Sequence, residues 1–291
     1  MSEVKLVVTQ LKSEIGNKAK NLERAFEIIK RESERDKPTV IMFPELYLTS
    51  YLVKDLVYKV AEPIPGPSTE KIERFLGDYP ETMVVMGMPE ISTKHYGIIY
   101  NSAAVITSEG VIEVYKKRHL PTFGVFDESR YFKPGPADKP RVLRFGGFNI
   151  GFVICYDAFF PETIKSFSLV GADIVGVLSA GPVASWPLWG PILRTRAIEN
   201  TVYIMYSNHI GFMDGLEFFG EARIINPIGQ VVRIGEPFKE QVLSHYATLS
   251  ELYAARQIRP IIKDFNYEDA IMLLRSYDDH IGRNDSHNVR L

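Results

Sequence analysis

The chain has 291 residues, of which 45% are hydrophobic and 24% charged, and its formal net charge is −2. These values are typical of a globular protein and exclude an overall field that would recruit nucleic acid or an anionic membrane. The single cysteine, Cys155, excludes an intrachain disulfide framework and a metal cluster built on cysteines. No apolar run approaches the roughly 20 residues of a membrane span, and the N-terminus lacks the apolar core of a signal peptide. We therefore expect a cytoplasmic protein with a reduced thiol.

Short apolar runs and amphipathic stretches alternate along the first half of the chain. A short buried run predicts a strand, and apolar residues at helical spacing predict a helix. The expected elements are a strand at 4–10, a helix at 17–35, a strand at 39–43, a helix at 69–76, a strand at 83–88, and a hairpin of strands 101–107 and 111–115.

The second half begins with a long irregular stretch at 119–135, which is typical of a functional loop. The expected elements that follow are a hairpin of strands 141–145 and 148–155, a helix at 161–170, a strand at 174–178, a loop that contains Trp186 and Trp189, a helix from about 191 to 200, a strand at 202–207, a hairpin of strands 222–226 and 230–234, a strand at 242–249, and a helix at 250–256.

Hairpins and strand–helix units alternate throughout, which predicts an α/β layered fold with mixed sheets. Neither a linker nor a repeat interrupts the pattern, so we expect residues 1–256 to form one domain. The tail at 257–291 mixes apolar and charged residues without a clear period, and we expect it to dock on another surface.

Three polar residues, Glu45, Lys117 and Cys155, each arrive at the end of an apolar run. Strand ends gather at one edge of a sheet, and a carboxylate, an ammonium and a thiol are sufficient for acyl transfer. The carboxylate would take the thiol proton, and the ammonium would stabilise the oxyanion after the thiolate attacks a carbonyl. The nearby cation is also expected to lower the thiol pKa. From spacing alone, each residue also has a non-catalytic interpretation: Cys155 as an inert buried thiol, Glu45 as a loop cap and Lys117 as a solvated charge.

The segments around these residues resemble the nitrilase superfamily of carbon–nitrogen hydrolases. The glutamate segment is Phe43-Pro-Glu with Tyr51, the lysine segment is Tyr-Lys-Lys-Arg-His-Leu-Pro at 115–121, and the nucleophile segment is Cys-Tyr-Asp at 155–157 with Phe-Pro-Glu at 160–162. Further segments that match in family order lie at 101–104, 127–135, 196–200, 208 with 211, 219–220 and 227–229.

This resemblance implies a four-layer αββα sandwich of two mixed β-sheets flanked by helices. It implies Glu45 as general base, Lys117 as stabiliser of the tetrahedral intermediate and Cys155 as nucleophile. Glu128 matches a second family glutamate, which hydrogen-bonds the lysine and helps to place the substrate. The backbone N–H of Tyr156 is expected to complete the oxyanion hole.

The resemblance also implies that no metal or organic cofactor is needed. It implies a homodimer, or a higher homo-oligomer built from dimers, that forms through the helices at 161–170 and 191–200, with the tail at 257–291 packing on the partner. Residues 1–256 would then be a carbon–nitrogen hydrolase domain.

The substrate is expected to be a small linear amide. Cys-Tyr-Asp differs from the Cys-Trp-Glu of true nitrilases, and Phe159 stands where members that act on carboxylate-bearing amides often carry arginine. N-carbamoyl hydrolysis, nitrile hydrolysis and a non-catalytic scaffold of the same fold remain alternative functions. Trp186 and Trp189 could line a pocket or pack a core. The further candidate substrate residues are Tyr51, Phe159, Ala180, Gly181 and Trp186.

Overall fold

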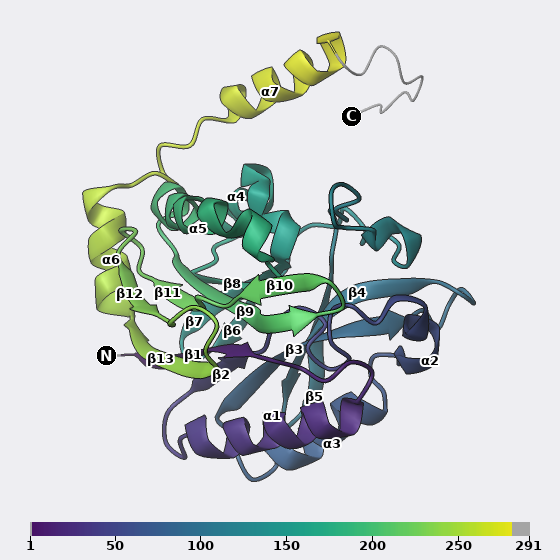
Figure 1. Cartoon of the computed structure of the whole chain (residues 1–291). Helices are drawn as coiled ribbons and strands as arrows, with labels where there is room; N and C mark the ends of the chain where they lie inside the picture. The colour runs from purple at the N-terminus through teal and green to yellow at the C-terminus, as the bar shows by residue number, and fades with distance from the viewer. Residues whose placement is uncertain (1, 281–291) are drawn as a thin grey trace.

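The strand β1 (Glu3–Leu11) is where the two halves of the fold meet in the computed structural model, which describes residues 2–280. It pairs in parallel with β2 (Thr39–Met42) and antiparallel with β13 (Gln241–Thr248). With β9 (Tyr203–Met213), however, it pairs only at its last two residues, Gln10 and Leu11. The sheet folds over at this short junction, so that its two halves lie face to face (Figure 1).

The first half of the sheet has the order β5-β4-β3-β2-β1, with β13 beside β1, and the second half has the order β9-β8-β7-β6. Both mix parallel and antiparallel pairs. Their remaining strands are β3 (Thr82–Ile91), β4 (Ile99–Thr107), β5 (Gly110–Lys116), β6 (Leu143–Phe145), β7 (Phe148–Ile154), β8 (Ile174–Ser179), β10 (Leu216–Phe219), β11 (Arg223–Ile225) and β12 (Val231–Ile234).

Successive side chains of β1 point to opposite faces of the sheet and so belong to two different cores. Val4 and Leu6 belong to the core between the two halves of the sheet, which also holds Phe148 of β7. Val7 and Leu11 belong instead to a second core beneath two helices. The first half is therefore buried on both faces.

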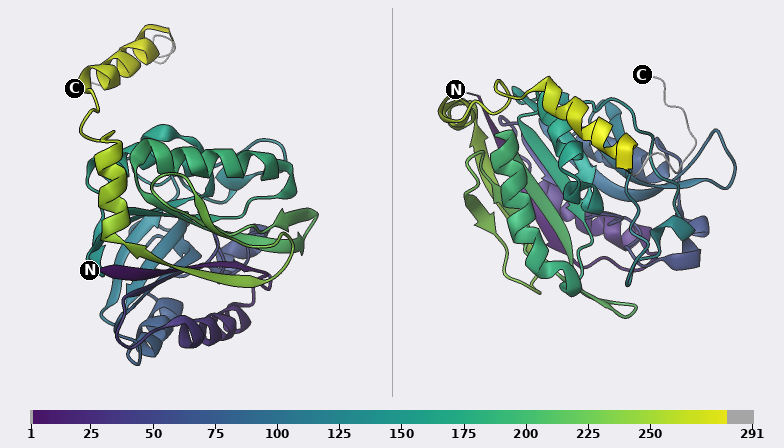
Figure 2. Two further views of the ribbon diagram at one scale, coloured as in Figure 1. Left: turned by 90° about the vertical axis from the view of Figure 1, so that its left-hand side faces the viewer. Right: turned by 90° about the horizontal axis from the view of Figure 1, so that it is seen from above.

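Helices cover the two outer faces, and Figure 2 shows them on opposite sides of the strands. The helices α1 (Lys18–Glu32) and α3 (Pro67–Leu76) lie on the first half, and α4 (Pro161–Leu169) and α5 (Trp186–Asn200) lie on the second. The expected αββα fold is confirmed, with its two sheets joined at β1. The remaining helical segments are η1 (Lys54–Leu56), α2 (Val57–Val60), η2 (Glu128–Arg130), η3 (Cys155–Phe159), η4 (Val183–Ser185), α6 (Leu249–Ile258) and α7 (Tyr267–His280).

Two elements differ from the sequence prediction. The helix α5 begins at Trp186, so both tryptophans lie on a helix and not in a loop. Pro187 fits the first turn of this helix, because a backbone N–H at that position would have no partner within the helix. The strand β9 continues to Met213 and forms a hairpin with β10, which the prediction omitted. Asp214 and Gly215 both have positive φ at its turn, and Asp-Gly is a known hairpin signal.

The tail contains the helix α7, which the sequence analysis did not predict because its residues show no clear period. This helix extends away from the sandwich (Figures 1 and 2) and exposes Met272, Leu273, Leu274 and Tyr277. Its docking on a partner, and the homodimer itself, stay predictions. Residues 281–291 of the predicted tail lie outside the described part of the chain. Among residues 2–280, no helix has the length and apolar character needed to cross a membrane.

A close approach between β3 and the end of β2 fixes the backbone around Glu45. A Cβ atom placed on Gly87 would lie 2.3 Å from the carbonyl oxygen of Pro44 and 2.5 Å from the backbone nitrogen of Leu46. Both neighbours are backbone atoms, so neither can rotate away. Only glycine lets β3 lie this close to the segment that carries Glu45.

We expect Gly87→Ala to lower the free energy of unfolding by about 1–3 kcal/mol, because the extra methyl group forces the backbone at Glu45 to move. Gly190→Ala is the matched control: in α5 the new Cβ would meet only the Arg223 side chain at 3.3 Å, and alanine favours a helix. Urea denaturation measures both variants. Equal midpoints for the two would contradict the role assigned to Gly87.

Candidate active site

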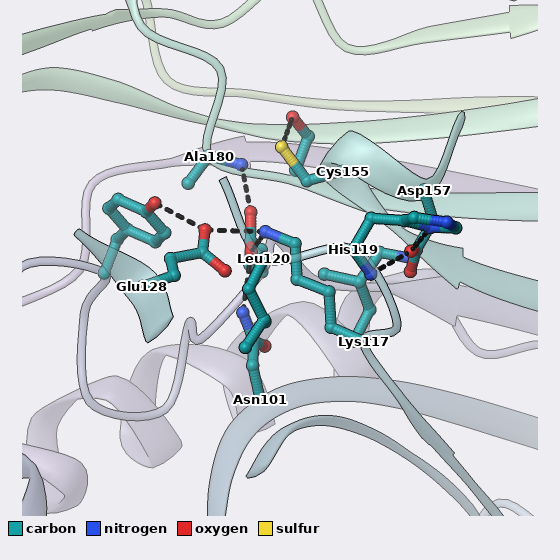
Figure 3. Close-up of polar contacts among 12 residues, drawn as sticks. Asn101, Lys117, His119, Leu120, Glu128, Cys155, Asp157 and Ala180 are labelled. Atoms are coloured by element: carbon teal, nitrogen blue, oxygen red, sulfur yellow. Dashed lines mark hydrogen bonds and ion pairs between the residues drawn. The ribbon is translucent and has the colours of Figure 1, made fainter. Parts of the chain in front are cut away.

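A buried ammonium shared by two carboxylates forms the centre of the site. Lys117 lies one residue beyond β5, and its Nζ is 2.6 Å from Oε1 of Glu45 and 2.6 Å from Oε1 of Glu128 (Figure 3). Lys117 and Glu45 are fully buried, and Glu128 almost so. The structure thus brings together three of the four residues that the sequence proposes as catalytic, with Glu45 coming from a segment 72 residues before Lys117.

The Glu45 carboxylate is held by donors from both halves of the sheet. Asn101 of β4 donates its side-chain N–H to Oε1 at 2.7 Å, and the backbone N–H of Ala180, just after β8, donates to Oε2 at 2.9 Å. The backbone of Glu45 is fixed as well, because its carbonyl oxygen lies 2.6 Å from Nε2 of His209. These contacts leave the carboxylate little freedom to rotate.

Cys155 occupies the corner between β7 and η3 with φ of 46°, a left-handed conformation unusual for a residue with a side chain. Such a conformation costs on the order of 1–3 kcal/mol and is found most often at functional sites. The thiol sulfur accepts a hydrogen bond from Ser179 Oγ at 3.5 Å, and Ser179 in turn accepts one from the Tyr206 hydroxyl at 3.3 Å. The Cys155 residue keeps 6% of its surface exposed.

The pKa of the Cys155 thiol reflects its burial and the charges of its neighbours. Burial raises the pKa of Cys155 well above its ordinary value, and the negative charge of Glu45 raises it further. Lys117 lowers the thiol pKa, but by less than these two effects raise it. The lowering expected from the cation is therefore present but outweighed, and the resting sulfur carries its proton at neutral pH.

The lysine and the second glutamate respond to the same burial in opposite ways. Burial alone would lower the pKa of Lys117, yet the carboxylates of Glu128 and Glu45 hold it above its ordinary value, so the side chain stays cationic. Burial raises the pKa of Glu128 to about 7; Lys117 opposes this rise and Glu45 adds to it. Within residues 2–280, Oε2 of Glu128 has no hydrogen-bond partner, whereas Oε1 also accepts from the Tyr51 hydroxyl at 2.6 Å.

Asp157 connects the lysine segment to the nucleophile corner, a role that sequence reasoning missed. Its buried carboxylate accepts from the backbone N–H of His119 at 2.9 Å and from the His119 ring at 2.8 Å (Figure 3). It also accepts from the Tyr115 hydroxyl at 2.9 Å. It also lies 3.4 Å from the backbone nitrogen of Ile154. The position of Lys117 relative to Cys155 therefore depends on this carboxylate. Its place in the Cys-Tyr-Asp motif was the only signal available.

The remaining candidates lie around this cluster in different roles. Tyr156 packs its ring against Phe123, Phe159 and Phe160, with ring centroids 5.4, 5.4 and 5.1 Å away. The backbone N–H of Gly181 donates to the Asn208 side chain at 2.8 Å, as that of Ala180 does to Glu45, so both amides are already engaged. An oxyanion role for the Tyr156 N–H stays a prediction.

The two tryptophans have separate environments. Trp189 is buried in the core, with its ring 4.9 Å from Tyr206 and 5.1 Å from Phe159. Trp186 stacks on Phe219 with ring centroids 5.4 Å apart and remains partly exposed. Of the two alternatives for the pair, core packing applies to Trp189, and a substrate contact by Trp186 or Phe159 stays a prediction.

Comparisons with known proteins point to one family. The carbon–nitrogen hydrolase family model matches residues 5–257. The glutamine-dependent NAD(+) synthetase of Aquifex aeolicus is 31% identical over 254 residues, which cover 84% of this chain and 42% of that protein. The nitrilase of Pyrococcus abyssi is 31% identical over 241 residues, 82% of this chain and 87% of that one.

A solved structure has the same fold. It is that of a mutant of the Nesterenkonia AN1 amidase from the nitrilase superfamily, with a TM-score of 0.77, 22% identity, and coverage of 94% of this chain and 97% of that one. The first curated relatives, the NAD(+) synthetases, are longer proteins, and this chain spans about half of their length.

We expect Asp157→Asn to lower the free energy of unfolding by about 3 kcal/mol, because an amide N–H₂ replaces an acceptor that faces buried donors. Tyr115→Phe is the control, since it removes one donor but keeps the carboxylate; its expected cost is about 1 kcal/mol. Urea denaturation of both variants measures the difference. An Asp157→Asn variant no less stable than Tyr115→Phe would show that the carboxylate does not hold the two segments together.

Glu128 should make stability depend on pH. Its pKa is about 7 when folded and near the ordinary 4.5 when unfolded, so its contribution is fully present below about pH 4.5 and is lost as the pH rises through 7. Between about pH 5 and pH 8, the wild type should therefore lose about 2–3 kcal/mol more stability than Glu128→Gln, which cannot ionise. Urea unfolding of both proteins at the two pH values measures this, and parallel losses would contradict it.

Proposed function

The chain belongs to the carbon–nitrogen hydrolase family, and from this premise we propose that it is a cysteine-dependent amidase that hydrolyses a small linear amide through a thioester. The observation that carries the proposal is the buried Lys117 ammonium, 2.6 Å from the Glu45 carboxylate, next to a thiol held at a strained corner. A scaffold that only kept the fold would have no need for two buried carboxylates around an ammonium, an arrangement that is costly to bury.

The first half of the proposed reaction forms the thioester. Glu45 takes the proton of Cys155 as the sulfur attacks the amide carbon, because the raised thiol pKa leaves few thiolates in the resting enzyme. The carbonyl oxygen becomes an oxyanion, which the Lys117 ammonium and the backbone N–H of Tyr156 stabilise. Glu45 then returns the proton to the leaving nitrogen, the carbon–nitrogen bond breaks, and ammonia departs.

The second half releases the acid. A water molecule gives a proton to Glu45 and its oxygen adds to the thioester carbon, so that a second oxyanion forms in the same place. When this intermediate collapses, the carbon–sulfur bond breaks and the proton held by Glu45 returns to the sulfur. The carboxylic acid leaves, and each side chain is back in its starting state.

The unpaired oxygen of Glu128 favours an amide over a nitrile. Oε2 is buried without a donor in the described part of the chain, and leaving such an acceptor unsatisfied costs about 1–3 kcal/mol. The N–H₂ group of an amide can donate to it, whereas a nitrile nitrogen carries no hydrogen. A carbamoyl group shares this N–H₂, and N-carbamoyl hydrolysis would be recognised by release of carbon dioxide together with ammonia.

The proposal is tested by following ammonia release from acetamide, butyramide, hexanamide and glutamine; glutamine is included because of the name of the NAD(+) synthetase relatives. Cys155→Ala should abolish release, by about 10⁴-fold or more, because the nucleophile is lost. Ammonia release that survives this substitution would contradict the mechanism.

The two adjacent lysines supply a matched pair of variants. Lys117→Met should abolish ammonia release, whereas Lys116→Met should retain it, because Lys116 is bound to Glu90 outside the buried cluster. Circular dichroism checks that both variants fold. Equal activity of the two would show that the buried ammonium has no part in the reaction.

A further inference from the structure

A cavity of about 110 Å³ adjoins the catalytic cluster and has no part in the proposed chemical steps. It lies between two loop segments, residues 51–57 and residues 125–132. Tyr51 and Glu128 form part of its lining, and these two side chains are hydrogen-bonded to each other at 2.6 Å. Because Glu128 also binds Lys117, one member of the catalytic cluster lines the cavity.

The walls of this cavity are mainly apolar. Val53, Val57 and Phe132 line it and are buried in the protein. An apolar surface with a few polar groups at one end is the usual composition of a site for a small organic ligand. The apolar walls would gain most from a ligand that removes them from water.

The charges around the cavity disfavour a carboxylate. All residues that line the cavity lie within the part of the chain that the structure describes, and Lys54 is the single cation among them. Its Nζ lies 2.5 Å from the Asp214 carboxylate. The other charged lining residues, Asp127 and Glu128, are acidic. A negatively charged ligand would therefore meet repulsion and no unpaired cation.

Aromatic contacts link the cavity to the nucleophile. Phe126 lines the cavity, and its ring centroid is 5.6 Å from that of Phe123. Phe123 is in turn 5.4 Å from Tyr156, the residue that follows Cys155. A chain of ring contacts thus connects a residue of the cavity wall to the residue that follows the nucleophile.

We propose that this cavity holds the acyl arm of the substrate, and that the substrates are primary amides with an uncharged aliphatic or aryl-alkyl arm. This inference rests on the proposed amidase activity and adds the substrate class. The arm lies between the segments at 51–57 and 125–132, and the amide group lies beside Glu128, the lining residue that also binds Lys117.

The first test compares amides of increasing length. From acetamide to butyramide and hexanamide, kcat/KM for ammonia release should rise about fourfold for each methylene group that is buried. Succinamate, which carries a carboxylate, should be a much poorer substrate than butyramide, a four-carbon amide like it. A rate independent of length, or a preference for succinamate or glutamine, would overturn the inference while leaving the amidase proposal intact.

A variant at the edge of the cavity locates the arm. Val125 lines the cavity and is 51% exposed, so glutamate is tolerated there without disturbing the core. Val125→Glu should lower the ratio of kcat/KM for hexanamide to that for acetamide about tenfold, because the arm would strip water from the new carboxylate. Val231→Glu, on the exposed strand β12, is the control and should leave the ratio unchanged. Equal ratios for the two variants would overturn the assignment.

Binding without turnover separates this inference from the proposed function. The Cys155→Ala variant should bind hexanamide more tightly than acetamide in a calorimetric titration, and Val125→Glu in the same background should weaken hexanamide binding. This pattern would support the cavity assignment even if the wild type released no ammonia, a result that would defeat the amidase proposal alone. Affinity that does not depend on the arm would overturn the assignment.

Discussion

The buried Lys117 ammonium is the charge on which the arrangement of the site depends. An ammonium cannot remain charged in the interior unless carboxylates lie beside it, and here two of them do, each at 2.6 Å. They come from the segment after β2 and from η2, so one charge connects the Glu45 segment to the connection that follows β5. Two carboxylates exceed one ammonium by one negative charge. Burial raises the pKa of Glu128 to about 7; the Lys117 ammonium opposes this rise, and the Glu45 charge adds to it.

Burial, together with this excess of negative charge, determines how the thiol can react. In a site with a free cation, a cysteine ionises before substrate arrives. Here the Lys117 charge is already shared between two carboxylates, and burial raises the pKa of Cys155. Proton removal must therefore accompany attack, which makes Glu45 essential in the proposed mechanism. The strained backbone at Cys155 and the Ser179 hydrogen bond then serve to aim a neutral thiol.

Sequence reasoning could find the residues of the cluster but not what holds them in place. Glu45, Lys117 and Cys155 each follow an apolar run, so the prediction that they meet at strand ends needed only the layered fold. Contacts such as Asp157 to His119, or Gly87 against the Glu45 backbone, depend on long-range packing and leave no local pattern. The start of α5 was misplaced because Pro187 and Pro191 both resemble helix starts. The hairpin turn at 214–215 had a local signal in Asp-Gly and was missed.

Glu128 joins the two parts of the site, since the carboxyl that binds Lys117 also lines the apolar cavity. An apolar arm that enters the cavity removes water from Glu128, which raises its pKa, whereas an amide N–H that reaches Oε2 stabilises the ionised form and lowers it. A substrate with both features balances these effects. An arm without an amide group leaves the desolvation of Glu128 uncompensated. The proposed selectivity for amides and the proposed selectivity for apolar arms thus act through one carboxyl group.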